Sequence, residues 1–127
     1  MPLRALVINC TLKPSPATSN TEALARVVMD ALEERGATTE IVRAVDHDIR
    51  PGVSADEGPG DAWPAIRERV MAADILVIAT PTWLGQPSSV CRRVMERMDA
   101  MLSETDDDGR PAAYGRVGGI VVTGNED

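Results

Sequence analysis

The 127-residue chain has few cysteines and few basic residues, and it has no long apolar run. Two cysteines, Cys10 and Cys91, are too few for a disulfide framework or for a zinc or iron–sulfur site, so we expect a protein of the reducing cytoplasm without a metal centre. With 13 basic against 20 acidic residues the net charge is −7, which argues against binding to nucleic acid. No stretch approaches the roughly 20 apolar residues that cross a bilayer, and the N-terminus lacks the layout of a signal peptide.

Two common phosphate-binding motifs are also missing. The chain has no G-x-x-x-x-G-K-[ST], which excludes a P-loop, and no G-x-G-x-x-G, which excludes the dinucleotide-binding Rossmann motif. Instead, an apolar stretch (5–9) runs into a loop that is rich in hydroxyls and contains the only lysine, Lys13, and the loop runs into a helix. Backbone N–H groups, the positive end of a helix dipole and several hydroxyls then meet at one point. This arrangement favours the phosphate of a mononucleotide such as FMN.

Apolar periodicity predicts strands and helices in alternation, which is typical of an α/β domain with a parallel sheet and helices on both faces. The predicted strands are 5–9, 39–45, 74–80 and 117–123. One predicted helix begins at the capping box Ser19–Glu22 and ends at Gly36, and two more span 62–72 and 88–102. Helical spacing is expected to turn two sets of residues toward the core: Leu24, Val27, Val28, Ala31 and Leu32, and then Val90, Val94, Met98, Met101 and Leu102.

Ligands of an open parallel sheet bind outside the carboxyl ends of its strands. Three loops therefore make the candidate site: 10–21, 81–87 and 124–127. The first suits a phosphate, the second offers an aromatic side chain and a glycine to a planar ring, and the third offers small polar residues to the edge of a heterocycle. The candidate residues are Thr11, Lys13, Ser19, Asn20, Thr21, Pro81, Thr82, Trp83, Leu84, Gly85, Gln86, Gly124, Asn125, Glu126 and Asp127.

Several of these residues also have a purely structural interpretation. Ser19 would cap a helix without any ligand, and Trp83 would serve in packing or in a dimer interface. Trp63 and the two cysteines are expected to be packing residues, and His47 is expected to be solvated. The acidic run 105–109 lacks the spacing of a calcium loop and is interpreted as a solvated turn.

Taken in order, the three loops resemble those of the flavodoxin-like NAD(P)H-dependent FMN reductases, and the resemblance covers essentially the whole chain. The family's phosphate loop has a hydroxyl, a basic residue and a Ser-x-Thr, and its second loop has Thr-Pro followed by an aromatic near a glycine. The matching residues here are Thr11, Lys13, Ser19, Asn20 and Thr21, then Thr80, Pro81, Trp83 and Gly85, and finally 123–127. Two features depart from the pattern: Lys13 stands where many members have arginine, and Pro14 and Pro16 are additional.

The resemblance implies a flavodoxin-like sheet with strand order 2-1-3-4, FMN as cofactor and NADPH or NADH as electron donor. Reducing equivalents would pass through the flavin to a small acceptor such as a quinone, a nitro compound or a flavin, or to a protein, with no indispensable catalytic side chain. Backbone N–H groups around 84–86 would face the flavin N5, those around 124–126 would face its pyrimidine edge, and a homo-oligomer (a dimer or a tetramer) is expected. Two alternatives remain: a flavodoxin-type electron carrier without nicotinamide turnover, which the acidity suits, and a module that has lost its flavin.

Members of that family continue past the fourth strand with a helix, a fifth strand and a final helix, whereas this sequence stops at Asp127. Strand 117–123 is apolar enough to need cover on both faces, and the order 2-1-3-4 puts it at an edge of the sheet. We therefore expect an FMN-binding domain, residues 1–127, that is incomplete at its C-terminal end. Further chain or a partner chain would cover this edge.

Overall fold

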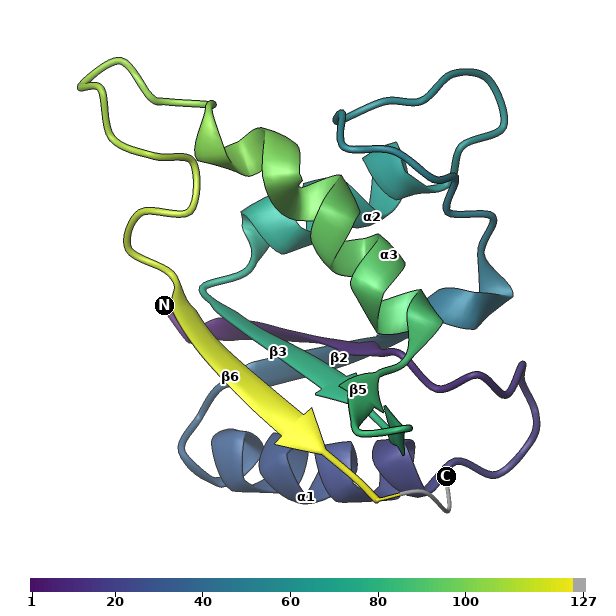
Figure 1. The fold of residues 1–127 in the computed structure, drawn as a ribbon. Coiled ribbons are helices and arrows are strands. Elements are labelled where there is room, and N and C mark those ends of the chain that lie inside the picture. Colours follow the sequence, from purple (N-terminus) through teal and green to yellow (C-terminus); the bar gives the residue numbers. More distant parts are fainter. Residues whose placement is uncertain (125–127) are drawn as a thin grey trace.

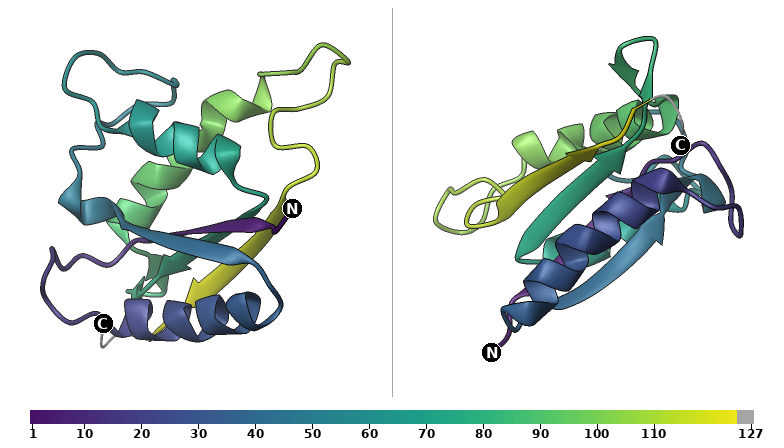
Figure 2. Two further views of the ribbon diagram at one scale, coloured as in Figure 1. Left: turned by 180° about the vertical axis from the view of Figure 1, so that it is seen from behind. Right: turned by 90° about the horizontal axis from the view of Figure 1, so that it is seen from below.

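The fold, taken from a computed structural model that describes residues 1–124, is built on a four-stranded parallel sheet in the order β2-β1-β3-β6. Its strands are β1 (Arg4–Asn9), β2 (Thr38–Arg43), β3 (Ile75–Thr80) and β6 (Val117–Val122). Helix α1 (Asn20–Glu34) covers one face, and helices α2 (Trp63–Ala72) and α3 (Ser89–Arg97) cover the other (Figures 1 and 2). The predicted fold class and strand order are confirmed.

Helix α1 begins and ends where the sequence predicts. The Ser19 hydroxyl accepts a hydrogen bond from the Glu22 N–H at 3.1 Å, which caps the first turn. Gly36 follows the helix with φ 92°, a left-handed conformation that glycine adopts without strain, and the Ala37 N–H donates to the Leu32 carbonyl at 3.1 Å. The capping box is only half formed, because the Glu22 carboxylate pairs with Arg26 and Arg43.

The predicted core-facing stripe of α1 is wrong at three positions. Leu24 and Val27 are 42% and 63% exposed, and Ala31 is also exposed, whereas Val28 and Leu32 are half-buried. The buried residues of the helix are Thr21, Ala25 and Met29. Apolar side chains occur on most sides of this helix, so their spacing alone does not show which side faces the sheet. The rotation follows instead from Ala25, which is small enough to lie close to the sheet, and from Thr21, which is hydrogen-bonded to Thr123.

The other face of the sheet packs against α2 and α3. Trp63, which was expected to be a packing residue, is fully buried there, and Pro64 is tolerated in the first turn of α2. Helix α3 ends at Arg97 and tightens into the 3-10 segment η2 (Met98–Leu102). Because a 3-10 helix turns further per residue than an α-helix, Leu102 leaves the predicted core stripe and is 81% exposed. The buried residues of this core are Leu6, Ile8, Cys10, Val42, Ala44, Ile49, Trp63, Ile66, Val70, Ala73, Cys91, Val94 and Met101.

A buried ion pair anchors the long segment between the 3-10 turn η1 (Ala44–Asp46) and α2. The Arg97 Nη2 atom lies 2.6 Å from Asp61 Oδ2, and neither side chain is exposed. Arg97 also donates to the carbonyls of Arg50 and Ser54, and its hydrogen bonds hold the pKa of the Asp61 carboxyl well below its ordinary value. A segment that the sequence shows only as a Gly- and Pro-containing loop is therefore fixed to α3.

Strand β6 lies at an edge of the sheet, as predicted. Its Val121 side chain packs with the cluster beneath α1. Val117, Ile120 and Val122 are 63%, 78% and 55% exposed. Residues 1–124 thus supply cover for one face of this strand and leave the other face and the edge open.

Candidate functional site

The carboxyl ends of β1, β3 and β6 bring the first two candidate loops and the end of β6 to one edge of the sheet. Thr123, the residue after β6, joins them: its Oγ1 atom lies 2.8 Å from Thr21 Oγ1, and its carbonyl accepts from Thr82 Oγ1 at 2.8 Å. The Ser88 hydroxyl donates to the Cys10 carbonyl at 2.7 Å and so links the second loop to the first. Three segments that are far apart in the sequence therefore form one connected site.

The first loop is held in place by its own side chains and by η1. Thr11 is fully buried; its N–H donates to Asn9 Oδ1 at 3.1 Å, and its hydroxyl accepts from the Lys13 N–H at 3.2 Å. Ser15 donates its N–H at 2.8 Å and its hydroxyl at 2.5 Å to the carboxylate of Asp46. These two hydrogen bonds hold the pKa of Asp46 below its ordinary value.

The polar candidates of this loop make defined contacts within the protein. Ser19 acts as the helix cap that its structural interpretation predicts, and Thr21 is buried against Thr123. The Lys13 ammonium donates to the Thr18 carbonyl at 3.3 Å, and Asn20, the first residue of α1, is exposed. An anion at this loop would meet the Lys13 charge and the positive end of the α1 dipole.

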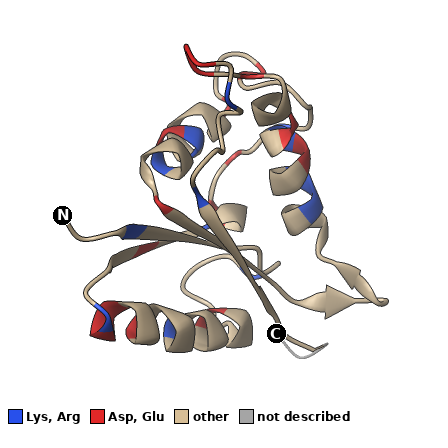
Figure 3. Ribbon diagram, turned by 90° about the vertical axis from the view of Figure 1, so that its left-hand side faces the viewer, with Lys and Arg blue, Asp and Glu red and all other residues tan. Residues whose placement is uncertain are grey.

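The second loop is a small β-hairpin, which the sequence did not predict. Strands β4 (Thr82–Trp83) and β5 (Gln86–Pro87) pair antiparallel around Leu84 and Gly85, which have φ of 50° and 73°. Positive φ at both central residues is the pattern of a type I′ turn, for which Asn-Gly is the usual signal and Leu-Gly is not. Pro81 is buried at its base, Trp83 is 37% exposed, and Leu84 is fully exposed. Figure 3 shows that the hairpin carries no charged residue.

The third loop is described only at its start. Gly124 follows Thr123 and is exposed. The candidates Asn125, Glu126 and Asp127 lie outside the described residues, so their predicted place beside the other two loops stays a prediction.

Two residues that organise the site were not among the candidates. Ser88 caps α3 by accepting from the Cys91 N–H at 3.0 Å while it donates to Cys10. Its position just before a helix is a signal that sequence reasoning can use. Asp46 has no such signal, because its partner Ser15 is 31 residues away in the chain.

Both cysteines are buried, as expected, and they lie together under the first two loops. The Cys10 thiol donates to the Ile8 carbonyl at 3.8 Å, and contact with Cys10 lowers the pKa of Cys91 to about 7. The same contact, together with burial, raises the pKa of Cys10. The pair is part of the packed core beneath the site.

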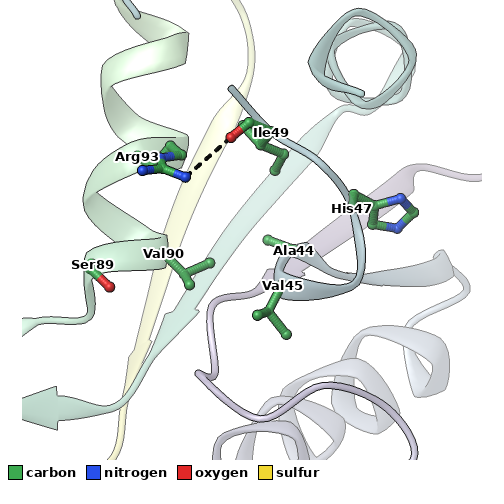
Figure 4. Close-up of a pocket in the computed structure, with 7 residues that line it drawn as sticks. All are labelled: Ala44, Val45, His47, Ile49, Ser89, Val90 and Arg93. Carbon is green, nitrogen blue, oxygen red and sulfur yellow. Dashed lines mark hydrogen bonds between the residues drawn. The ribbon is translucent and has the colours of Figure 1, made fainter. Parts of the chain in front are cut away.

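A pocket of about 170 Å³ lies between η1 and the start of α3 (Figure 4). Arg93 donates there to the Ile49 carbonyl at 3.4 Å, and His47, which is exposed as predicted, lies at the pocket wall. The lining residues are Ala44, Val45, His47, Ile49, Ser89, Val90 and Arg93. None of the candidate residues that the structure describes lines this pocket, so it is separate from the first two loops.

Residues 1–124 lack a metal centre and a membrane-spanning helix. They contain no group of three or more His, Cys, Asp or Glu side chains arranged to hold a metal ion. None of their helices has the length and apolar character needed to cross a membrane. The acidic run 105–109 forms a turn in which Asp106 accepts from the N–H groups of Asp108 and Arg110 at 2.9 Å.

A parallel sheet of this order, covered on both faces and carrying a Ser/Thr-rich loop after its first strand, defines a flavodoxin-like protein. The crystal structure of a flavodoxin from Streptococcus pneumonia TIGR4 has the same fold. It matches with a TM-score of 0.55 and 19% identity over 95% of this chain and 61% of the flavodoxin.

Within that fold the chain belongs to a particular family: the model of the NADPH-dependent FMN reductases matches residues 3–127. The chain is 35% identical to the 8-demethyl-8-aminoriboflavin-5'-phosphate synthase of Streptomyces davaonensis, over all of this chain and 53% of that enzyme. It also resembles the crystal structure of RosB with the bound intermediate 8-demethyl-8-formylriboflavin-5'-phosphate. The TM-score there is 0.88 and the identity 36%, over 98% of this chain and 53% of RosB.

A second curated relative is much longer. The chain is 48% identical to the divalent metal cation transporter MntH of Mycobacterium bovis over 129 residues, which are 98% of this chain and 19% of that protein. The chain therefore spans about half of one curated relative and about a fifth of the other.

Proposed function

We propose that this chain forms the FMN-binding domain of an oxidoreductase that passes reducing equivalents from NADPH or NADH through the flavin to a small acceptor. A quinone, a nitro compound or a free flavin would serve as acceptor. The observation that carries the proposal is the junction at Thr123, where the end of β6 meets the first two loops at the carboxyl edge of the sheet, in a member of the NADPH-dependent FMN reductase family. The relative that holds a riboflavin-5'-phosphate derivative and matches 98% of this chain supports a flavin 5'-phosphate as the ligand.

The residues at this edge fit the two halves of such a ligand. Lys13 and the start of α1 suit the phosphate, and the uncharged hairpin suits a planar ring. A Cβ placed on Gly85 would have no atom within 4 Å, so the hairpin backbone is open to a ring at this point. When bound, FMN would supply the hydride-accepting and electron-passing chemistry, and the chain would bind and orient it.

We assign the candidate residues accordingly. Thr11, Lys13, Ser19, Asn20 and Thr21 shape the phosphate end, and Pro81, Thr82, Trp83, Leu84, Gly85 and Gln86 shape the ring end. Gly124, Asn125, Glu126 and Asp127 are assigned to the polar edge of the ring. The proposal extends to the whole protein: it has this activity, and it forms a homo-oligomer.

One observation favours a second function. The Streptomyces davaonensis relative is named as a synthase of an aminoriboflavin phosphate, and its identity to this chain is well above that of the flavodoxin. By that analogy a flavin 5'-phosphate would be the substrate and would itself be modified.

A single experiment separates these functions. The full-length protein is mixed with FMN or with riboflavin, and NADPH or NADH is then added without oxygen. If the protein is a reductase, it binds FMN, and the yellow absorbance of the bound flavin disappears when the nicotinamide is added. If it is a carrier, it binds FMN but the nicotinamide does not bleach it. Mass spectrometry of the flavin after incubation detects the modified product of the second function, and failure to bind FMN refutes the proposal.

A further inference from the structure

Arg43 ends β2 and reaches across to loop 12–18. Its Nη1 atom donates to the Ala17 carbonyl at 2.7 Å and to the Lys13 carbonyl at 3.1 Å, and its Nη2 atom donates to Glu22 Oε1 at 3.2 Å. The side chain is only 10% exposed. One guanidinium therefore ties both ends of the loop to the first turn of α1.

The bond to Ala17 fixes the direction of a backbone donor. A peptide bond is planar and trans, so the N–H of Thr18 points away from the Ala17 carbonyl and thus away from Arg43. Within residues 1–124 this N–H donates no hydrogen bond. Pro14 and Pro16 have no N–H, and the Ser15 N–H is taken by Asp46, so Thr18 supplies one of the few donors that this loop can present to an anion.

The bond to Glu22 removes a charge that would repel an anion. Glu22 lies in the first turn of α1, beside the loop, and its side chain is 27% exposed. Arg43 pairs with one carboxylate oxygen, and Arg26 lies 3.4 Å from the other. Arg26 touches no loop carbonyl, which makes it a matched control.

We propose that Arg43 is a positioning residue that holds loop 12–18 in the shape that receives a phosphate monoester. This rests on the proposed function and adds to it the residue that sets the preference for FMN over riboflavin. An arginine is required because the planar fork presents donors to two carbonyls and a carboxylate at once, whereas the lysine ammonium acts as a point charge on a flexible stem. In the sequence, Arg43 looks only like a polar residue of an edge strand.

The test compares the affinities of the full-length protein for FMN and riboflavin in four variants: R43Q, R43K, R26Q and R26K. We expect both Arg43 variants to bind FMN roughly tenfold or more weakly, since a charge-assisted network is lost, with riboflavin affinity changed less than about twofold. R26K should keep the FMN-to-riboflavin ratio of the unmodified protein, and R26Q, which also removes a partner of Glu22, should lower that ratio less than R43Q does. If R43Q does not fold, the R43K and R26K pair decides the question alone.

Other outcomes overturn the proposal. An R43K variant with the original FMN affinity would show that the positive charge is sufficient and that the planar guanidinium group of Arg43 is not required. An equal loss of FMN and riboflavin affinity would show that Arg43 acts only through overall stability. If the unmodified protein binds riboflavin as well as FMN, there is no phosphate site for Arg43 to position; if it binds neither flavin, the proposed function fails as well.

Discussion

Loop 12–18 and the hairpin 82–87 belong to the same candidate site but are held very differently. Arg43 and Asp46 tie the loop to β2 and η1 through four hydrogen bonds of 3.1 Å or less. The hairpin stands out from the sheet (Figure 2), and its side chains make one hydrogen bond to the rest of the described chain, from Thr82 to the Thr123 carbonyl. A phosphate has one shape and is negatively charged at neutral pH, so a preformed loop favours its binding. A flavin ring that must also leave room for a second reactant is better served by a hairpin whose conformation can adjust.

Leu84 destabilises the hairpin in two ways. Its apolar side chain is fully exposed, and its backbone has a positive φ, which β-carbon-bearing residues rarely adopt. Both features are unfavourable in the isolated domain. Strained positions of this kind cluster at functional sites, which supports the assignment of the hairpin to the ring end.

The largest expected contrast is between the two tryptophans. Trp63→Ala should lower the free energy of unfolding by about 3–5 kcal/mol, because the side chain is fully buried. Trp83→Ala should cost less than about 1 kcal/mol, because it lies at the surface, but it should weaken FMN binding and change the flavin reduction potential. Urea unfolding and fluorescence titration with FMN measure the two effects. If Trp83→Ala leaves FMN affinity unchanged, Trp83 is only a packing residue.

The sequence predicted the features that depend on residues close together in the chain. The alternation of strands and helices, the Ser19 cap and the Gly36 terminus depend on apolar runs and on residues within a few positions of each other, and all are confirmed. The strand order, which the family resemblance implied, is confirmed as well. The core face of α1 was predicted wrongly, because its rotation depends on Thr123, 102 residues beyond Thr21. The tethers from Arg43 and Asp46 are missing from the sequence prediction for the same reason.

The hairpin was missed for a different reason. Its turn has Leu where Asn or Gly is usual, so the local rule indicates a loop and does not identify the hairpin. The sequence rule for hairpins thus fails at a turn whose first central residue is not the one that would stabilise it most.

The next largest effect concerns the two serine caps. Ser19→Ala combined with Thr21→Val should weaken FMN binding by roughly 1–3 kcal/mol per lost bond to the phosphate, with riboflavin affected much less. Ser88→Ala is the control: it removes the cap of α3 and a buried bond to Cys10, and should cost about 1–2 kcal/mol of stability. It should leave the FMN-to-riboflavin ratio alone. Equal losses for both flavins in the Ser19 variant would mean that the first loop acts through stability only.

Leu84→Asn sharpens the contrast in the opposite direction. Asparagine tolerates positive φ and completes the Asn-Gly pair of a type I′ turn, so the variant should gain about 0.5–1 kcal/mol of stability. The exposed leucine contributes no packing that would be lost. We expect the gain to come with weaker flavin binding or slower flavin reduction. Thermal unfolding and anaerobic reduction by NADPH are the measurements, and a variant that is more stable and fully active would remove Leu84 from the ring end.

The smallest expected effect is a pH dependence at the tether between Ser15 and Asp46. The pKa of Asp46 is held below its ordinary value of 3.8 in the folded protein, because the carboxylate accepts two hydrogen bonds from Ser15. Its contribution to stability is therefore complete above pH ~4 and is lost as the pH falls through the folded pKa. Asp46→Asn keeps an acceptor but removes the charge, so its Tm should lie slightly below that of the unmodified protein at neutral pH. The gap should close on acidification, because protonation of Asp46 removes the same charge from the unmodified protein, whereas protonation of Asp61 affects both proteins alike. A gap that stays constant down to pH ~3 would show that the Asp46 charge does not hold the loop, and the difference between the two loops would then rest on Arg43.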